Sequence, residues 1–364
     1  MSSPNLIGRP SRRAALALAA CFLAALACHA RTALARQPQQ PPATSTDVER
    51  GVELYRQGDF KGATKALRAA VKKQSKSDPR AWLFLGQALM WRGELGDARK
   101  AFDSALRLDP NFASARASLA FLHLNAGRVR DAEREAARAV ELDPNHIDAH
   151  YVVGVLRLRE GAWLRAIEKA DQIIKLDERA ALAYALKSEA LLGLHEYGRR
   201  IIADESRGAY GYGPATVEQA RASQPSRLKE AAENLEKYLS LVPPTPDAAA
   251  KREQLEAMLA YAETDPARRI YRMSEATTRA VIKAKPEPDY TEEARRAGIT
   301  GFVRLRAVLA ADGTVKHVLV LKGLSYGLTE KCVAAARKIR FEPATLNGAP
   351  VSQVVMLEYN FNIF

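Results

Sequence analysis

The chain has 364 residues, a length that excludes one small domain and fits two or three. Hydrophobic residues make up 47% of the chain and charged residues 27%, which excludes wholesale disorder. The formal net charge of +13 leaves nucleic acid, an anionic membrane and acidic proteins open as partners and says nothing about the fold.

Residues 1–35 have the pattern of an export segment. Arg9, Arg12 and Arg13 precede an apolar run at 14–28, and the small residues just before Arg36 offer a cleavage site. The run is shorter than the ~20 residues that a membrane-spanning helix needs. We therefore expect a cleaved signal and a periplasmic protein, with an uncleaved inner-membrane anchor as the alternative. An exported protein does not meet the genome, so nucleic acid is excluded as a partner.

Cysteine use follows from the same segment. Cys21 and Cys28 lie within it, so Cys332 is the one cysteine of the mature chain and no internal disulfide can form. We expect Cys332 to be a small buried residue on a helix face. Residues 36–46 are rich in Pro and Gln and predict a flexible tether.

Small residues recur with a period of 34 through residues 47–198, in a column formed by Gly86, Ala120, Gly154 and Ser188. Glycines recur in a second column, and Pro110 and Pro144 stop the second helix of their units. The spacing predicts two amphipathic helices per unit, with small residues where the helices approach closely. A lone pair cannot bury its apolar face, so the units are expected to stack.

Unit 79–112 is the cleanest copy, with Trp82, Leu85, Gly86, Gly93, Leu95, Ala98, Phe102, Ala105 and Pro110 in phase. This pattern resembles the tetratricopeptide repeat family. The resemblance implies a superhelical array that binds a protein or peptide in a groove formed by the first helix of each unit. Candidate exposed groove positions are Gln87, Met90, His123, Arg157 and Lys187.

The pattern weakens over residues 199–264. A Gly/Tyr-rich insertion at 198–226 is expected to be a surface excursion, with a ligand loop as the alternative. Helices are then predicted at 228–241 and 246–263, and we interpret them as a degenerate capping pair. Residues 265–284 are predicted to be a linker.

The hydrophobic period changes from 3.6 to 2 in the C-terminal module, residues 285–364. Thr291 is a helix-capping residue, and Asp312-Gly313 is a tight-turn signal between two strands. Val303, Leu305, Ala307 and Leu309 form one face of the first strand, and Arg304 and Arg306 lie on the other. The predicted order is a helix to 297, strands at 302–310 and 315–322, a helix at 328–340 and a last strand at 351–364.

Several motifs of this module occur together in order: Tyr290–Arg295, Gly301–Val303, Asp312–Val315, Ala334–Ala344 and Tyr359–Phe361. They resemble the C-terminal domain of the TonB family, with Thr291 departing from the Pro that many members have. The whole chain is thus predicted to be multi-domain: an all-α TPR-like superhelix followed by a small α+β domain with two helices and a three-stranded antiparallel sheet.

The TonB resemblance implies that the last strand binds an extended peptide of an outer-membrane TonB-dependent receptor, or of another envelope protein, by strand addition. The implied contact positions are Val354, Val355, Met356, Leu357, Glu358, Tyr359, Asn360 and Phe361, with Glu358 and Asn360 pointing away from the core. The alternative is that this strand pairs in a homodimer, which would make the chain an envelope scaffold. The two resemblances together imply a periplasmic protein-binding adaptor or a TonB-like energy transducer. A standard TonB has an uncleaved membrane helix and a long Pro/Lys-rich spacer, whereas this chain has a short apolar run, a short tether and the repeat array.

The sequence lacks a recognisable catalytic or cofactor motif. His146 and His150 are four residues apart without a third ligand, so we expect no metal site. We also expect no cofactor and no enzymatic activity.

Overall fold

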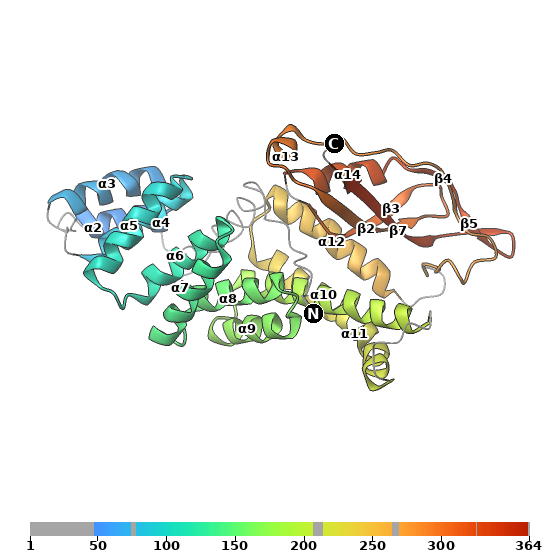
Figure 1. The fold of residues 1–364 in the computed structure, drawn as a ribbon, viewed down its shortest axis with the longest axis horizontal. Coiled ribbons are helices and arrows are strands. Elements are labelled where there is room, and N and C mark those ends of the chain that lie inside the picture. Colours follow the sequence, from blue (N-terminus) through green and yellow to red (C-terminus); the bar gives the residue numbers. More distant parts are fainter. Residues whose placement is uncertain (1–46, 74–77, 207–213, 264–268, 325, 363–364) are drawn as a thin grey trace. The chain divides into compact units, whose positions relative to one another are not determined.

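The computed structural model describes residues 47–73, 78–206, 214–263, 269–324 and 326–362. The predicted export segment and tether lie outside these ranges. The chain divides into two compact units between Leu186 and Lys187, and each is described by itself (Figure 1). In the part of the chain that is described, no helix combines the length and apolar character required to cross a bilayer.

The first unit is an array of helix pairs, as the repeat predicts. Its helices are α2 (Asp47–Arg56), α3 (Phe60–Lys73), α4 (Pro79–Trp91), α5 (Leu95–Leu108), α6 (Ala113–Asn125), α7 (Val129–Leu142), α8 (Ile147–Arg159) and α9 (Trp163–Leu176). Gly93 turns between α4 and α5 with a φ of 77°, a conformation that glycine adopts without strain. A methyl group at Gly86 would lie 2.5 Å from a ring carbon of Phe102, so the small-residue column marks close helix approach.

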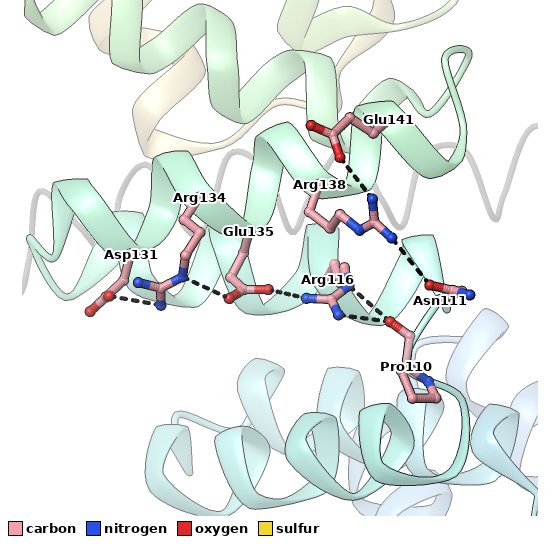
Figure 2. A network of polar contacts seen from close by, with 8 residues as sticks. All are labelled: Pro110, Asn111, Arg116, Asp131, Arg134, Glu135, Arg138 and Glu141. Carbon is pink, nitrogen blue, oxygen red and sulfur yellow. Dashed lines mark hydrogen bonds and ion pairs between the residues drawn. The ribbon is translucent and has the colours of Figure 1, made fainter.

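A network of ion pairs and hydrogen bonds joins α6 to α7 and both helices to the loop before them, as Figure 2 shows. Arg116 donates to the Pro110 carbonyl at 2.7 Å and to Glu135 Oε2 at 2.8 Å. Glu135 is buried, and Arg134 approaches its other oxygen at 3.4 Å. Arg138 reaches Asn111 from the next turn of α7. Carbonyl groups at the inter-repeat loop thus have partners that hydrophobic packing alone would not supply.

The second unit begins with helices α10 (Ala181–Ser206, of which 187 onward belongs here), α11 (Pro214–Leu241) and α12 (Pro246–Ala262). Ser188 Oγ donates to the Ala231 carbonyl at 2.7 Å, and Lys251 pairs with Glu189 at 2.6 Å, so these three helices contact one another. The expected excursion at 198–226 is therefore wrong where it is described, because α10 runs to Ser206 and α11 starts at Pro214. Pro225 lies inside α11 although proline usually ends a helix.

The C-terminal sheet has the predicted antiparallel strands in the order β3 (Val315–Lys322), β2 (Gly301–Leu309), β7 (Gln353–Phe361). Helices α13 (Glu292–Arg296) and α14 (Leu328–Ala336) accompany it, and Thr291 caps α13 by accepting from the Ala294 amide. The core between α14 and the sheet contains Val303, Leu305, Cys332, Leu357 and Tyr359. The two-helix, three-strand prediction is confirmed.

Two short two-stranded ladders lie outside that prediction. Strand β1 (Val281–Ala284) pairs with β4 (Arg340–Glu342), so the expected linker at 265–284 contains a strand. Strands β5 (Ala344–Leu346) and β6 (Ala349–Val351) are joined through Asn347 and Gly348, whose φ values of 52° and 85° match a tight hairpin turn.

The second face of the sheet is covered as well. Arg306 is only 2% exposed, its guanidinium lies 5.1 Å from the Tyr261 ring centre, and it pairs with Glu196 of α10. Tyr261 of α12 donates its hydroxyl to the His317 carbonyl at 2.9 Å. His317 has a φ of 49° beside a register shift, which is a β-bulge that turns this carbonyl toward α12. Helix α12 therefore packs on the face opposite α14, and α10 reaches that face through Glu196 (Figure 1).

Candidate protein-binding surfaces

Strand β7 is an edge strand of the three-stranded sheet, since only β2 pairs with it along its length in the described residues. Gln353 faces Leu309 and Phe361 faces Gly301 in one uninterrupted antiparallel register. Val354 donates its N–H to the Tyr271 carbonyl at 2.9 Å, on the side away from β2. Because donors alternate along a strand, Met356, Glu358 and Asn360 also direct their backbone groups outward.

Two contacts occupy part of this open edge. A single bridge places Tyr271 beside Gln353, which closes the edge at the start of β7. Lys285 Nζ donates to the Glu358 carbonyl at 2.7 Å and lies 4.3 Å from the Tyr359 ring centre. Within the described ranges, the outward amide and carbonyl of Met356 and Asn360 have no partner. Met356 and Asn360 are thus open to an extended chain, and at Glu358 between them the outward carbonyl already accepts from Lys285.

The side chains of the eight edge positions alternate as the sequence predicts. Leu357, Tyr359 and Phe361 are buried in the core, while Glu358 and Asn360 are exposed and Met356 is 51% exposed. Val354 and Val355 are half-buried. Arg304 of β2 pairs with Glu358 across the sheet at 2.8 Å, so the exposed face beside the edge carries an ion pair. Their role in binding stays a prediction.

The core behind β7 holds its titratable groups uncharged. Burial, followed by the nearby Glu287 carboxylate, raises the pKa of the Cys332 thiol to about 12. Burial likewise raises the pKa of Tyr359 to about 12. Cys332 is fully buried, which confirms the expectation that it is a core residue rather than a reactive thiol.

The five candidate groove positions of the repeat array have different environments. Gln87 donates to Ser118 Oγ at 3.3 Å, between the first helices of adjacent units, and Arg157 pairs with Glu133 at 2.6 Å. Lys187 belongs to the second unit and pairs with Glu230 at 3.3 Å. Polar residues therefore connect neighbouring elements at three of these positions.

The expected exposure of Met90 and His123 is wrong, since they are 5% and 4% exposed. Helices α4 and α6 each contact their own partner helix and both neighbouring units, so most of their circumference is buried. Burial, followed by the Arg128 charge, lowers the pKa of His123, so its ring is favoured in the neutral form. The position of a residue within the 34-residue repeat therefore does not by itself distinguish these buried positions from the exposed positions of the same helix.

The two histidines considered as metal ligands each have another partner. His146 Nε2 lies 3.1 Å from Ser114 Oγ, and His150 Nε2 lies 2.6 Å from the Pro144 carbonyl. Among the residues that the structure describes, no group of three His, Cys, Asp or Glu side chains has a metal-binding arrangement.

Comparisons with known families agree with both predicted modules. The family described as Gram-negative bacterial TonB protein C-terminal matches residues 286–363, and two tetratricopeptide repeat families match residues 48–112 and 92–156. No curated protein matches the chain. Both matched families are protein-interaction domains, and the first is typical of envelope proteins.

Several solved structures are similar to the chain. MamA is 24% identical with a TM-score of 0.36, over 51% of this chain and 95% of its own. TTC0263, a thermophilic TPR protein of Thermus thermophilus, is 17% identical with a TM-score of 0.41, over 58% and 97%. YrrB, a TPR protein with an unusual peptide-binding site, is 16% identical with a TM-score of 0.34, over 57% and 90%. All three TM-scores are below 0.5.

The matched segments and the observed helix pairs and sheet together identify the chain as a tetratricopeptide repeat array followed by a domain of the TonB C-terminal type.

Proposed function

We propose that this protein is a periplasmic adaptor that binds two proteins, one on each module. The C-terminal domain takes an extended segment of an outer-membrane receptor along β7, and the repeat array binds a second envelope protein. The open edge of β7 is the observation that carries the proposal, because in the described part of the chain Met356 and Asn360 present unpartnered backbone groups next to a buried core strand. Strand addition needs this arrangement.

The contacts that partly cover the edge support an exchange of partners. An incoming strand would pair with the outward groups of Met356, Glu358 and Asn360. Its amide would replace Lys285 Nζ at the Glu358 carbonyl, a contact between two exposed residues. Tyr271 would limit the bound segment to the part of β7 beyond Val354. The bound peptide is thus predicted to span only a few residues, with specificity set near Met356 and Glu358.

Met356→Pro tests the edge without removing a bond of the sheet itself. The outward N–H of Met356 is lost, whereas the bonds between β7 and β2 come from its neighbours. We expect capture of outer-membrane proteins from solubilised native envelopes by the full-length chain to fall at least about tenfold, since the ring also blocks close approach of a strand. Met356→Ala keeps the N–H and is the matched control, with capture near the wild-type level.

Equal capture by the two variants would contradict strand addition. The same variants also separate the scaffold alternative, in which β7 pairs with β7 of a second copy. Three results together would favour that scaffold: the wild-type chain is a dimer by size, Met356→Pro makes it monomeric, and neither captures a receptor. The assembly role would then replace the adaptor role.

A further inference from the structure

A hollow of about 720 Å³ lies on the first repeat, along the outer side of α3. Its cationic lining consists of Lys61, Lys65, Arg68 and Lys72 from α3 and Arg92 from the α4–α5 turn, with Asp59 as the one acid. The α3 residues are spaced by four, three and four positions, so they form a single stripe along the helix. All four are exposed.

The counter-charges near the hollow are few. Arg68 pairs with Glu94 at 3.0 Å and with Asp97 at 3.7 Å, and Arg92 pairs with Glu94 at 2.8 Å. The Asp59 carboxylate accepts from the Gly62 amide at 2.8 Å, as a helix cap does. Within the described part of the chain, Lys61, Lys65 and Lys72 have no acidic partner. The hollow therefore keeps a net positive charge at its rim.

The other second helices of the array differ from α3. Helix α5 carries Asp97 and Asp103, α7 carries four acids, and α9 carries Glu168 and Asp171, whereas α3 has no acidic residue at all. An ordinary solvated helix face mixes both signs, as these three do. A single-sign stripe on one repeat is a feature that stacking and solubility do not require.

The chemistry of the lining indicates phosphate groups at a surface. Lysine binds phosphate as a flexible point charge and does not need the fixed geometry that arginine imposes. None of the lining residues is aromatic, so nucleic-acid bases have no stacking platform. In the sequence, only residues 29–46 separate the apolar run from α2, a chain that spans at most roughly 60 Å. The first repeat is therefore the repeat closest in sequence to the segment that is predicted to enter a membrane during export.

We propose that this hollow binds the phosphate headgroups of anionic phospholipids, and so holds the repeat array against the periplasmic face of the inner membrane. Each free lysine close to an anionic bilayer strengthens binding about fivefold. The three lysines together then account for about a hundredfold. This contact is independent of strand addition at β7, so either can fail without the other.

The test uses the chain from Arg36 onward, which keeps every described helix and strand but lacks the apolar run. We expect it to sediment with phosphatidylcholine vesicles that contain one third phosphatidylglycerol and not with pure phosphatidylcholine vesicles. Lys61→Gln/Lys65→Gln/Lys72→Gln is expected to lose about a hundredfold of this affinity. The matched control, Arg130→Gln/Arg165→Gln/Lys175→Gln, removes three exposed charges elsewhere in the array and is expected to change it less than fivefold.

Two further arms make each outcome decisive. Lys61→Arg/Lys65→Arg/Lys72→Arg preserves the charges and is expected to bind like wild type. Loss of binding in the control triple to the same extent would show a general charge effect and overturn the site. Full competition by millimolar glycerol phosphate would show a soluble-phosphate site. Lysine-dependent binding of polyglutamate without vesicle binding would show an acidic-protein site, and either result overturns the lipid assignment.

Discussion

Glu196→Ala is expected to lower the free energy of unfolding of the second unit by about 3–5 kcal/mol, the cost of leaving a buried cation without its partner. Arg306 is 2% exposed, and Glu196 is the acid that pairs with it. The Nε–H of Arg306 already has no acceptor in the described structure. Arg199 lies 4.0 Å from the same carboxylate, and burial, followed by the Arg306 charge, lowers its pKa to about 10. Two cations thus depend on one acid.

Cys332 provides the measurement. In the chain from Arg36 onward it is the one cysteine, it is fully buried, and it reacts with a thiol reagent only when the second unit opens. The Glu196→Ala chain is expected to label about two to four orders of magnitude faster than wild type. Glu358→Ala is the control. It removes the exposed ion pair between Glu358 of β7 and Arg304, which lies on β2 as Arg306 does, and it is expected to cost less than about 1 kcal/mol of the free energy of unfolding.

A double variant distinguishes a lost attraction from a stranded charge. Glu196→Leu/Arg306→Met removes both charges from the interface and is expected to recover much of the loss, because no ion remains buried without a partner. A Glu196→Ala cost below about 1 kcal/mol, equal to that of Glu358→Ala, would contradict the claim that α10 and α12 enclose Arg306.

Gly86→Ala is expected to destabilise the repeat array by about 1–3 kcal/mol through overpacking. The added methyl group would lie 2.5 Å from one carbon of the Phe102 ring and 2.7 Å from a second. Phe102 is fully buried between α4 and α5, so its ring has no free space to move into. The helices must separate to admit the methyl group.

Gly96→Ala is the matched control, and it is expected to stabilise the array. Gly96 lies in α5 with nothing within 4 Å of the added methyl group, and alanine is favoured over glycine in a helix by about 1 kcal/mol. Trp82, Trp91 and Trp163, the three tryptophans of the chain, all lie in the first unit. Denaturant unfolding followed by tryptophan fluorescence therefore reports on the array. The denaturant concentration at the unfolding midpoint is expected to be highest for Gly96→Ala, lower for wild type and lowest for Gly86→Ala. A stable Gly86→Ala chain would contradict the close approach.

The sequence predicts features that repeat or alternate. The column of Gly86 and its equivalents gives the helix pairs, and the alternation of Leu357, Tyr359 and Phe361 gives the inner face of β7. Thr291 and Asp312-Gly313 mark a helix start and a turn by local chemistry alone. Each of these signals depends on neighbours close in the chain, so a single sequence carries it.

Long-range packing was not predictable in the same way. Arg306 looks like a surface residue by alternation, and only Glu196 and Tyr261, more than forty residues away, explain its burial. Pro225 and the Gly/Tyr-rich stretch suggest a loop, yet α11 includes the proline. Met90 and His123 have the phase of groove residues and are buried by adjacent units. In each instance the deciding contact is made by a distant segment.

Residue-resolved amide exchange of the free chain examines the edge of β7 without any assumption about the partner. We expect fast exchange at Met356 and Asn360 and slow exchange at Leu357, Tyr359 and the Tyr271-bonded Val354, with Met356 and Asn360 becoming protected when a receptor segment is bound. Slow exchange at Met356 and Asn360 in the free monomer would show that the edge of β7 is already occupied, and peptide binding there would be ruled out.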